Sequence, residues 1–477
     1  MARSKRFLIL LAVLAAACAA AAIALNWQQR QEQIQTSGEA VLEIDPDSVQ
    51  ALSWTRGELS LSFTRDEEGN WSYDGDDAFP VDPEAMEQLL SPFAPFSAAF
   101  VIEEAQDEGQ YGLDEPECSI SIDTGETSYE ILLGDTSAVD GQRYVSFGDR
   151  KVYLAADDPL EAYEATLYDC ILNDAVPAMD QVTDLAISGE EDYEIFYQED
   201  NGAYTYCAED VYFTQRDGET LPLDTGRVED YLSALAALDL TDYVTYSATD
   251  AELEQFGLDE PQLTVTVDYT AEAEDGTQSE GTFTLHVSRD PDELAQAEQE
   301  GEDAGDEEEE ETITAYARVG DSPIVYSITE LEYTSLMAAG YDDLRHQEVL
   351  TASFDDVRSL DVTLDGEQYT FTAQGEGEER TWSWEEQEID LTALQEAVEG
   401  LTADTFTDQA PEGQQEVALT VRLDNETFPQ VEVALYRYDG ADCLAVVDGE
   451  SVCLVERAAV VELMEAVRAI VLGGGEE

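Results

Sequence analysis

Most of the chain consists of short segments in which hydrophobic and polar residues alternate, separated by turns that contain Gly or Asp. Alternation with a period of two is typical of strands that bury one face and expose the other. Many of these segments follow one another closely, as expected for antiparallel hairpins. The clearest alternating positions are Ile120 and Ile122, then Leu263, Val265 and Val267, and finally Val417, Leu419 and Val421.

Three other segments have hydrophobic residues at the spacing of an amphipathic helix. In the first of them, Asp82 is a good N-cap and Pro83 suits the first helical position. A cofactor site could use such stripes, but packing of a helix on a sheet explains them better, and we expect core packing. The hydrophobic positions are Met86, Leu89 and Leu90, then Val228, Tyr231, Leu232 and Leu235, and finally Leu391, Leu394, Val398 and Leu401.

A hexapeptide motif occurs twice, at residues 111–116 and 256–261. An aromatic strand segment and a helix precede each copy, and strands that end in a hairpin follow it, an order that a chance repeat would not reproduce. The same features return a third time around residues 409–413, where Gln-Ala-Pro-Glu-Gly replaces the motif. The two copies are Tyr111, Gly112, Leu113, Asp114, Glu115 and Pro116, and Phe256, Gly257, Leu258, Asp259, Glu260 and Pro261.

These patterns predict an α+β fold, in which an N-terminal transmembrane helix precedes about three repeated modules of antiparallel sheet with packed helices. The third module is diverged, and a helix over residues 458–472 ends it. The expected boundaries are 1–36 for the basic flank, anchor and linker, 37–175 for the first module, 176–350 for the second with an acidic insertion at 290–311, and 351–477 for the third.

The hexapeptide is best interpreted as a turn between a short helical segment and a strand. Gly112 and Gly257 suit the left-handed position just past a helix end, and Leu113 and Leu258 are placed to fold back as its apolar partner. The proline disfavours a helical conformation for the glutamate before it and favours an extended one. Ligand contact by the two acids of the motif is the alternative interpretation, but we expect a structural role.

The N-terminus predicts export. Three basic residues among the first six precede an uncharged apolar run over residues 7–25, which as a helix is long enough to span a bilayer. Because basic flanks stay in the cytoplasm, the bulk of the chain should be extracytoplasmic and held at the cell membrane by one span. We prefer a retained anchor for this segment. The alternatives are a signal peptide that is cleaved at residues 22–24 and a lipoprotein signal that uses Cys18.

The charge of the chain excludes several classes of partner. Its 477 residues include 110 acidic and 20 basic side chains, for a net charge of −90. Such a chain repels nucleic acids and anionic lipid headgroups, although a hydrophobic content of 43% is enough for a folded core. Residues 290–311 include 13 acids and no basic residue. We expect this insertion to be disordered by self-repulsion and to bind divalent ions only diffusely.

Little in the sequence indicates catalysis. The chain has two histidines, His286 and His346, and lacks the common hydrolase, metalloprotease and nucleotide-binding motifs. We therefore expect no catalytic residue, cofactor, metal ligand or small-molecule substrate, with a carboxylate-only enzyme as a third-ranked alternative. Cys443 and Cys453 flank a hairpin turn, and the length of that turn decides whether they face each other. We favour two separate buried thiols at these positions, with a disulfide between them as the alternative.

The [YF]-G-L-D-x-P motif behind an N-terminal membrane segment, with the strands and Val-Tyr hairpin that follow it, resembles the bacterial DUF4340 family (domain of unknown function). The resemblance covers most of residues 40–460 and includes a junction at Asp342-Asp343-Leu344-Arg345. Members are often encoded beside ABC-type exporters. The resemblance therefore implies a non-enzymatic accessory or interaction component of an ABC-type export system, bound to a permease or ATPase. The alternative is a free-standing acidic envelope protein that binds a wall polymer or cations.

Overall fold

The computed structural model describes residues 39–473, apart from 104, 106, 139–140, 274–275, 302–312 and 376–379. The chain divides into two compact units, one that ends at Asp174 and one that begins at Ala175. The apolar run that we interpret as a membrane anchor lies outside the described residues. Among the residues that are described, no helix is both long and apolar enough to cross a membrane.

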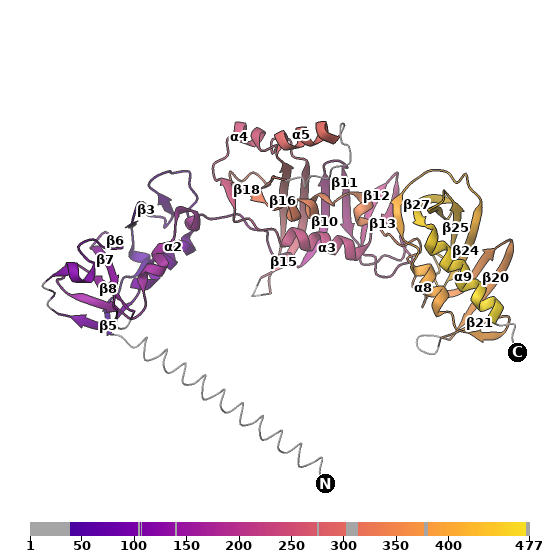
Figure 1. The fold of residues 1–477 in the computed structure, drawn as a ribbon, viewed down its shortest axis with the longest axis horizontal. Coiled ribbons are helices and arrows are strands. Elements are labelled where there is room, and N and C mark those ends of the chain that lie inside the picture. Colours follow the sequence, from indigo (N-terminus) through magenta and orange to yellow (C-terminus); the bar gives the residue numbers. More distant parts are fainter. Residues whose placement is uncertain are drawn as a thin grey trace, which may run out of the picture. The chain divides into compact units, whose positions relative to one another are not determined.

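The first unit contains one antiparallel sheet with short helices (Figure 1). Leu52 and Trp54 of β2 and Leu61 and Phe63 of β3 are buried, and residues between them are more exposed, as the alternation predicts. The elements are β1 (Glu39–Leu42), η1 (Pro46–Ser48), β2 (Ala51–Arg56), β3 (Leu59–Arg65), β4 (Trp71–Tyr73), α2 (Pro83–Leu90), η2 (Ser91–Phe93), β5 (Phe96–Ile102), η3 (Glu108–Tyr111), β6 (Cys118–Asp123), β7 (Ser128–Thr136), β8 (Arg143–Ser146), β9 (Val152–Ala155), η4 (Pro159–Glu164) and η5 (Leu167–Cys170).

The second unit begins with the second sheet. On α3, Val228, Tyr231 and Leu235 are buried, whereas Leu232 is half-buried. The elements are β10 (Gln181–Ser188), β11 (Tyr193–Tyr197), β12 (Tyr212–Arg216), β13 (Glu219–Pro222), α3 (Thr225–Ala236), β14 (Tyr243–Thr245), α4 (Asp250–Gln255), β15 (Leu263–Glu272), β16 (Gln278–Arg289), α5 (Pro291–Gly301), β17 (Ala315–Val319), β18 (Val325–Ile328), α6 (Glu330–Met337) and α7 (Tyr341–Leu344).

The third sheet follows in the same unit, and its core includes the buried stripe of α8 and the inner face of α9. The predicted C-terminal helix over 458–472 is confirmed as α9. The elements are β19 (Val357–Leu364), β20 (Glu367–Gln374), β21 (Thr381–Trp384), β22 (Gln387–Ile389), α8 (Thr392–Glu399), β23 (Ala403–Phe406), β24 (Gln415–Leu423), β25 (Gln430–Arg437), β26 (Asp442–Val447), β27 (Glu450–Glu456) and α9 (Arg457–Gly473).

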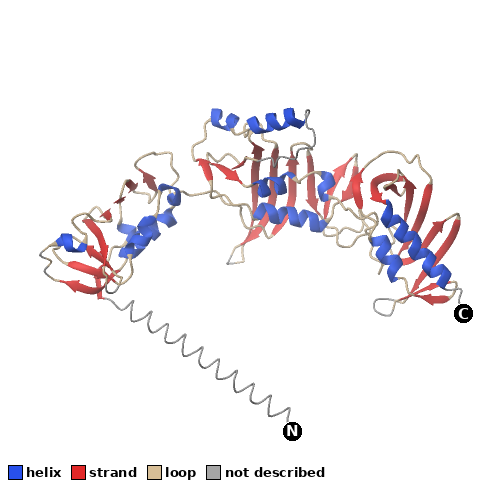
Figure 2. Cartoon of the chain, viewed as in Figure 1, coloured by secondary structure: helices blue, strands red, loops and turns tan. Residues whose placement is uncertain are grey.

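The three sheets share one strand order, which confirms the prediction of three related α+β modules. In each, two strands that are distant in the chain are neighbours in the sheet: β2 and β6, β10 and β15, β19 and β24. Helices accompany every sheet (Figure 2). Helix α3 packs with α6, and α8 packs with α9. The shared orders are β4-β3-β2-β6-β7-β8-β9-β5, β12-β11-β10-β15-β16-β17-β18-β14 and β21-β20-β19-β24-β25-β26-β27-β23.

The expectation of a disordered insertion over residues 290–311 is wrong for its first half, which forms helix α5. The Asp290 side chain accepts hydrogen bonds from the backbone nitrogens of Asp292 and Glu293, at 3.0 and 3.1 Å. Glu293 in turn accepts from the backbone nitrogen and hydroxyl of Thr314. Acidic residues are favourable in the first turn of a helix, so the same charge that suggests disorder stabilises this one. Residues 302–312 lie outside the described residues.

Cys443 and Cys453 are free, buried thiols. The turn between β26 and β27 has two residues, but the pairing is irregular after Ala445. One extra residue of β27 lies there and shifts the register of the remaining pairs by one. Cys453 is therefore paired with Ala445, and Cys443 with Val455. Burial raises the pKa of each of the two cysteine thiols to about 11, so both stay protonated at neutral pH.

Candidate functional site

The hexapeptide motif forms the same helix end in both copies. In the first, Gly112 follows η3 with φ 67° and ψ 20°, which is left-handed. In the second, Gly257 lies one residue past the C-cap of α4 and has φ 69°. Both glycines therefore have the conformation that the pattern predicts.

The leucine after each glycine folds back on the helix end. The backbone nitrogen of Leu113 donates to the carbonyl of Glu108 at 3.2 Å, and that of Leu258 to the carbonyl of Leu253 at 2.8 Å. Both leucine side chains are buried. This is the hydrogen bond of a Schellman end with its apolar contact, and it supports the structural interpretation of the motif.

The other residues of the motif attach the turn to the sheet or face solvent. The ring of Tyr111 lies 4.9 Å from that of Tyr144, and the ring of Phe256 lies 4.7 Å from that of Tyr316. The prolines are half-buried. The two copies belong to different compact units, and all four acids are exposed. The exposed acids are Asp114, Glu115, Asp259 and Glu260.

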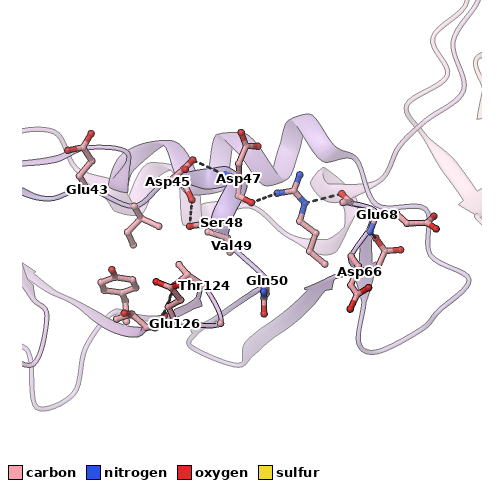
Figure 3. A pocket seen from close by; sticks show the side chains of 17 residues that line it. Glu43, Asp45, Asp47, Ser48, Val49, Gln50, Asp66, Glu68, Thr124 and Glu126 are labelled. Atoms are coloured by element: carbon pink, nitrogen blue, oxygen red, sulfur yellow. Dashed lines mark hydrogen bonds between the residues drawn. The ribbon is translucent and has the colours of Figure 1, made fainter.

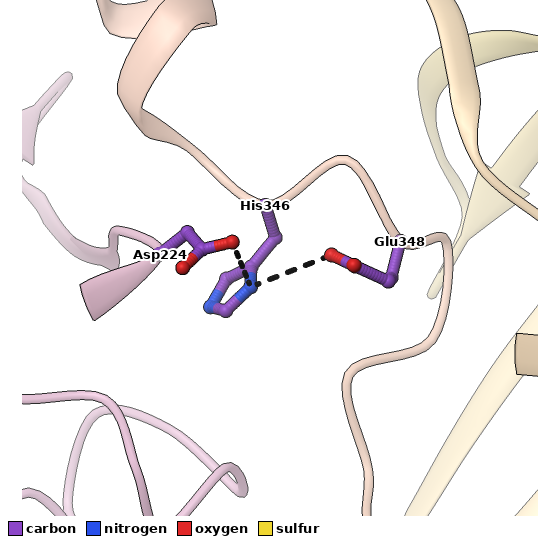
Figure 4. Close-up of side chains that lie close together, drawn as sticks. All are labelled: Asp224, His346 and Glu348. Carbon is purple, nitrogen blue, oxygen red and sulfur yellow. Dashed lines mark ion pairs between the residues drawn. The ribbon is translucent and has the colours of Figure 1, made fainter. Parts of the chain in front are cut away.

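A second group of polar residues meets where the second module ends. His346 lies two residues past α7. Its Nδ1 is 3.8 Å from Oδ2 of Asp224 and 3.9 Å from Oε2 of Glu348 (Figure 4). Both distances exceed a hydrogen bond. One ligand atom from each of the three residues lies within 4.8 Å of the other two.

Asp210 holds the His346 ring from its other nitrogen. His346 Nε2 donates to Asp210 Oδ1 at 2.8 Å, since an ionised carboxylate has only acceptors. Asp210 is 1% exposed, and its second oxygen accepts from the Thr205 hydroxyl at 2.7 Å. Burial lowers the pKa of His346, but the hydrogen bond to Asp210 and the charges of Asp210, Asp224 and Glu348 outweigh burial and raise the pKa above its ordinary value.

Asp224 and Glu348 are fixed by different elements. Asp224 is the N-cap of α3, and its Oδ1 accepts from the backbone nitrogen of Arg227 at 3.2 Å. Arg227 Nε also lies 3.7 Å from Oδ2 of Asp224. Glu348 instead forms an antiparallel bridge with Thr402, just before β23.

The segment around Glu348 is hydrogen-bonded to the third module on both sides of that bridge. The backbone nitrogen of Val349 donates to the carbonyl of Leu401 at 2.9 Å, and that of Ala403 to the carbonyl of Gln347 at 2.7 Å. We call residues 345–349 the linker segment. It belongs by sequence to the second module and by pairing to the third.

Arg345 adds a side-chain contact between the same two modules. Its guanidinium carbon lies 3.4 Å from the centre of the Phe406 ring and 5.1 Å from that of Tyr341. Its Nη2 donates to the carbonyl of Val452 at 3.2 Å. Cation–π contacts of this kind contribute about 2 kcal/mol when the cation is desolvated.

A cleft of about 1010 Å3 lies beside the linker segment, within the second unit. Arg345 and Arg216 line it, and both are engaged with Tyr341, since the Arg216 guanidinium carbon lies 4.3 Å from that ring. The cleft therefore favours a polar or basic segment of chain over an anion. Its acidic lining residues include Asp217, Glu219, Asp408, Asp448 and Glu450.

The first unit has a separate groove of about 950 Å3, lined largely by exposed carboxylates (Figure 3). Arg65 is the one basic residue among those that line it. Its Nε donates to the carbonyl of Gly69 at 3.0 Å. The groove can attract cations, but its carboxylates are solvated and spread out. They are Glu43, Asp45, Asp47, Asp66, Glu67, Glu68 and Glu126.

The sequence did not reveal the His346 cluster. The His-x-Glu pair of His346 and Glu348 is the one local signal, and it is weak. Asp210 precedes His346 by 136 positions, and among 110 acidic residues no pattern selects it. His286, the other histidine, lies on β16 and contacts the Thr264 hydroxyl, away from this cluster.

Comparison with protein-family models gives two matches to DUF4340, described as a domain of unknown function, over residues 71–250 and 214–419. Together they cover well over half of the chain. The first match begins in β4 and the second in β12, strands that hold the same place in their sheets. No curated protein and no solved structure matches the chain.

Substitution of Gly112 by Ala should destabilise the first unit by more than the about 1–2 kcal/mol that a left-handed alanine costs. The added methyl would lie 2.8 Å from the backbone nitrogen of Asp135. Gly148→Ala is the matched control, because Gly148 has φ 75° and open space around it. Unfolding in urea, followed through hydrogen exchange in β6 and β7, measures the loss of stability in both variants. Equal losses in the two variants would contradict the packing role of the motif.

Substitution of Arg345 by Ala should weaken the coupling between the second and third modules by about 2 kcal/mol. We expect one urea transition of the second unit to separate into two, as seen by hydrogen exchange in β16 and β25. Arg216→Ala, which removes a stack within the second module, should leave the two sheets coupled. A single, unchanged transition in Arg345→Ala would show that this contact does not join the modules.

Proposed function

Because the chain belongs to the DUF4340 family, we propose that it is a non-enzymatic, membrane-anchored extracytoplasmic protein that serves as an accessory or interaction component of an ABC-type export system. The link to exporters rests on the resemblance, since members of the family are often encoded beside such systems. Membrane anchoring rests on the apolar run over residues 7–25 and on the basic residues that precede it.

The observation that supports an interaction role is the acidic cleft between two successive modules. Its volume of about 1010 Å3 suits a short segment of a partner chain rather than a small metabolite. The arginines that line it already stack on aromatic rings, so its carboxylates set the preference for the partner. A basic or polar extracytoplasmic loop of a permease would meet that preference.

The contacts of His346 also favour a structural use over catalysis. A general base needs a nitrogen that is free to accept a proton near neutral pH. In His346 one ring nitrogen donates to buried Asp210, and the surrounding carboxylates raise the pKa of the ring. These contacts hold the ring in place where the second and third modules meet.

A second candidate function is that of a free-standing envelope protein that binds a wall polymer or cations. The acidic groove of the first unit favours it, because seven exposed carboxylates line one surface. Such a protein would bind through charge alone, and its binding would fall steeply with added salt.

Crosslinking in intact cells, followed by affinity capture from solubilised membranes, tests these functions. We expect a permease or ATPase of the ABC class at near-stoichiometric yield. Neutralising four cleft acids should lower that yield several-fold, whereas neutralising four groove acids should not. The cleft variant is Asp217→Asn, Glu219→Gln, Asp408→Asn and Glu450→Gln; its control is Glu43→Gln, Glu67→Gln, Glu68→Gln and Glu126→Gln.

Both variants change the net charge by the same amount, so a difference between them cannot come from total charge. Recovery of the protein alone would contradict the exporter proposal and favour the second candidate function. Equal recovery of an ABC component by both variants would place the contact outside the cleft.

A further inference from the structure

We propose that Asp224, His346 and Glu348 form a binding site for a divalent transition-metal ion, with Zn2+ as the reference ion, and that the bound ion links the second and third modules. The sequence alone gave no reason to expect metal ligands in this chain. The proposal is independent of any export partner, because it concerns atoms within the second unit.

The first argument is the spacing of the ligand atoms. Nδ1 of His346 is 3.8 Å from a carboxylate oxygen of Asp224 and 3.9 Å from one of Glu348. A tetrahedral ion with bonds of about 2.0–2.2 Å to nitrogen and oxygen separates its ligands by about 3.3–3.6 Å. The two distances from Nδ1 are thus too long for hydrogen bonds and only a few tenths of an ångström above coordination spacing. The two carboxylate oxygens lie within 4.8 Å of each other and would close on the ion as it binds.

The hydrogen bond at Nε2, on the other side of the His346 ring, supports the site independently of that spacing. Ligating histidines commonly donate their other N–H to a carboxylate, which fixes the tautomer and the ring plane. Asp210 is placed for this role: it accepts from Nε2 at 2.8 Å, is 1% exposed, and is held by Thr205. With the proton on Nε2, the lone pair of Nδ1 faces the two carboxylates, and a metal ion bound there would take the place of a second ring proton.

The ligands are also held by separate parts of the backbone. Oδ2 of Asp224 faces His346 while Oδ1 caps α3, and Glu348 is paired with Thr402 of the third module. An ion between them would therefore join α3 to the strand edge at β23. Arg227 Nε, 3.7 Å from the same Asp224 oxygen, can stay, since a carboxylate oxygen has lone pairs for both.

The donor set identifies the class of ion. One imidazole with two carboxylates suits Zn2+ and its first-row neighbours, whereas Mg2+ and Ca2+ prefer oxygen ligands alone. His346 and Glu348 line the cleft, so water can complete the coordination. The net charge of −90 attracts any cation to the surface, and a test must separate diffuse from specific binding.

The test is calorimetric titration of the full-length, detergent-solubilised chain with Zn2+, in physiological salt and excess Mg2+ to suppress diffuse binding. We expect one saturable site per chain. Glu348→Gln removes a direct ligand and should weaken Zn2+ binding about 100-fold. That is as much as the most costly loss of an outer-shell partner. Glu450→Gln, which removes an equal charge from the same cleft, should leave it unchanged. Asp224→Asn should also weaken Zn2+ binding, and it keeps a good N-cap on α3.

Co2+ in place of Zn2+ gives a readout of geometry, because a His-carboxylate site produces a visible absorption band that diffusely bound Co2+ does not. Zn2+ should also raise the melting temperature of the wild-type chain and of Glu450→Gln, but not of Glu348→Gln. No saturable site in the wild-type chain, or equal weakening of Zn2+ binding in Glu348→Gln and Glu450→Gln, would overturn the proposal.

Discussion

The hydrogen bond between His346 and the buried carboxylate of Asp210 holds the linker segment in place, and the linker segment joins the two sheets of the second unit. Asp210 is 1% exposed and would be costly to bury without partners, so its two bonds, to His346 and Thr205, act together. With the ring held, residues 347–349 follow in register against 401–403. The second module thus supplies a strand-like segment to the third, and the contacts of Arg345 close the same junction.

The repeated module explains why such a junction is needed. A sheet with one buried face is stable only when something covers that face, and here helices that follow the strands in sequence do so. Each module can therefore form its own core, as the buried cluster of the third one shows. Within the second unit, the second and third modules are joined by backbone hydrogen bonds of the linker segment, by the contacts of Arg345, and by Tyr206, which packs against the core of the third module.

Local patterns predicted most of the fold because they reflect local physics. The alternation in β6, the Asp82 cap and the glycine of the hexapeptide each specify their structure within a few residues. Helix α5 was missed because acidic residues were interpreted as repulsive, although one of them, Asp290, caps its first turn with two hydrogen bonds. The His346 cluster could not be predicted, since Asp210 precedes His346 by 136 positions and Asp224 is brought beside it by tertiary contacts, among them the hydrogen bond from its backbone nitrogen to the carbonyl of Leu344. The same holds for the cysteines, whose register depends on one irregular pair.

The linker segment pairs with the third module, and it should make the two sheets of the second unit unfold as one cooperative body. Native-state hydrogen exchange in a series of low urea concentrations measures this most directly. We expect the backbone amides of Val349 and Ala403 to exchange with the same opening free energy as the amides of the central strands β15 and β24. Fast exchange of those two amides while both sheets stay protected would contradict it, because the modules would then be joined only as separate bodies on one chain.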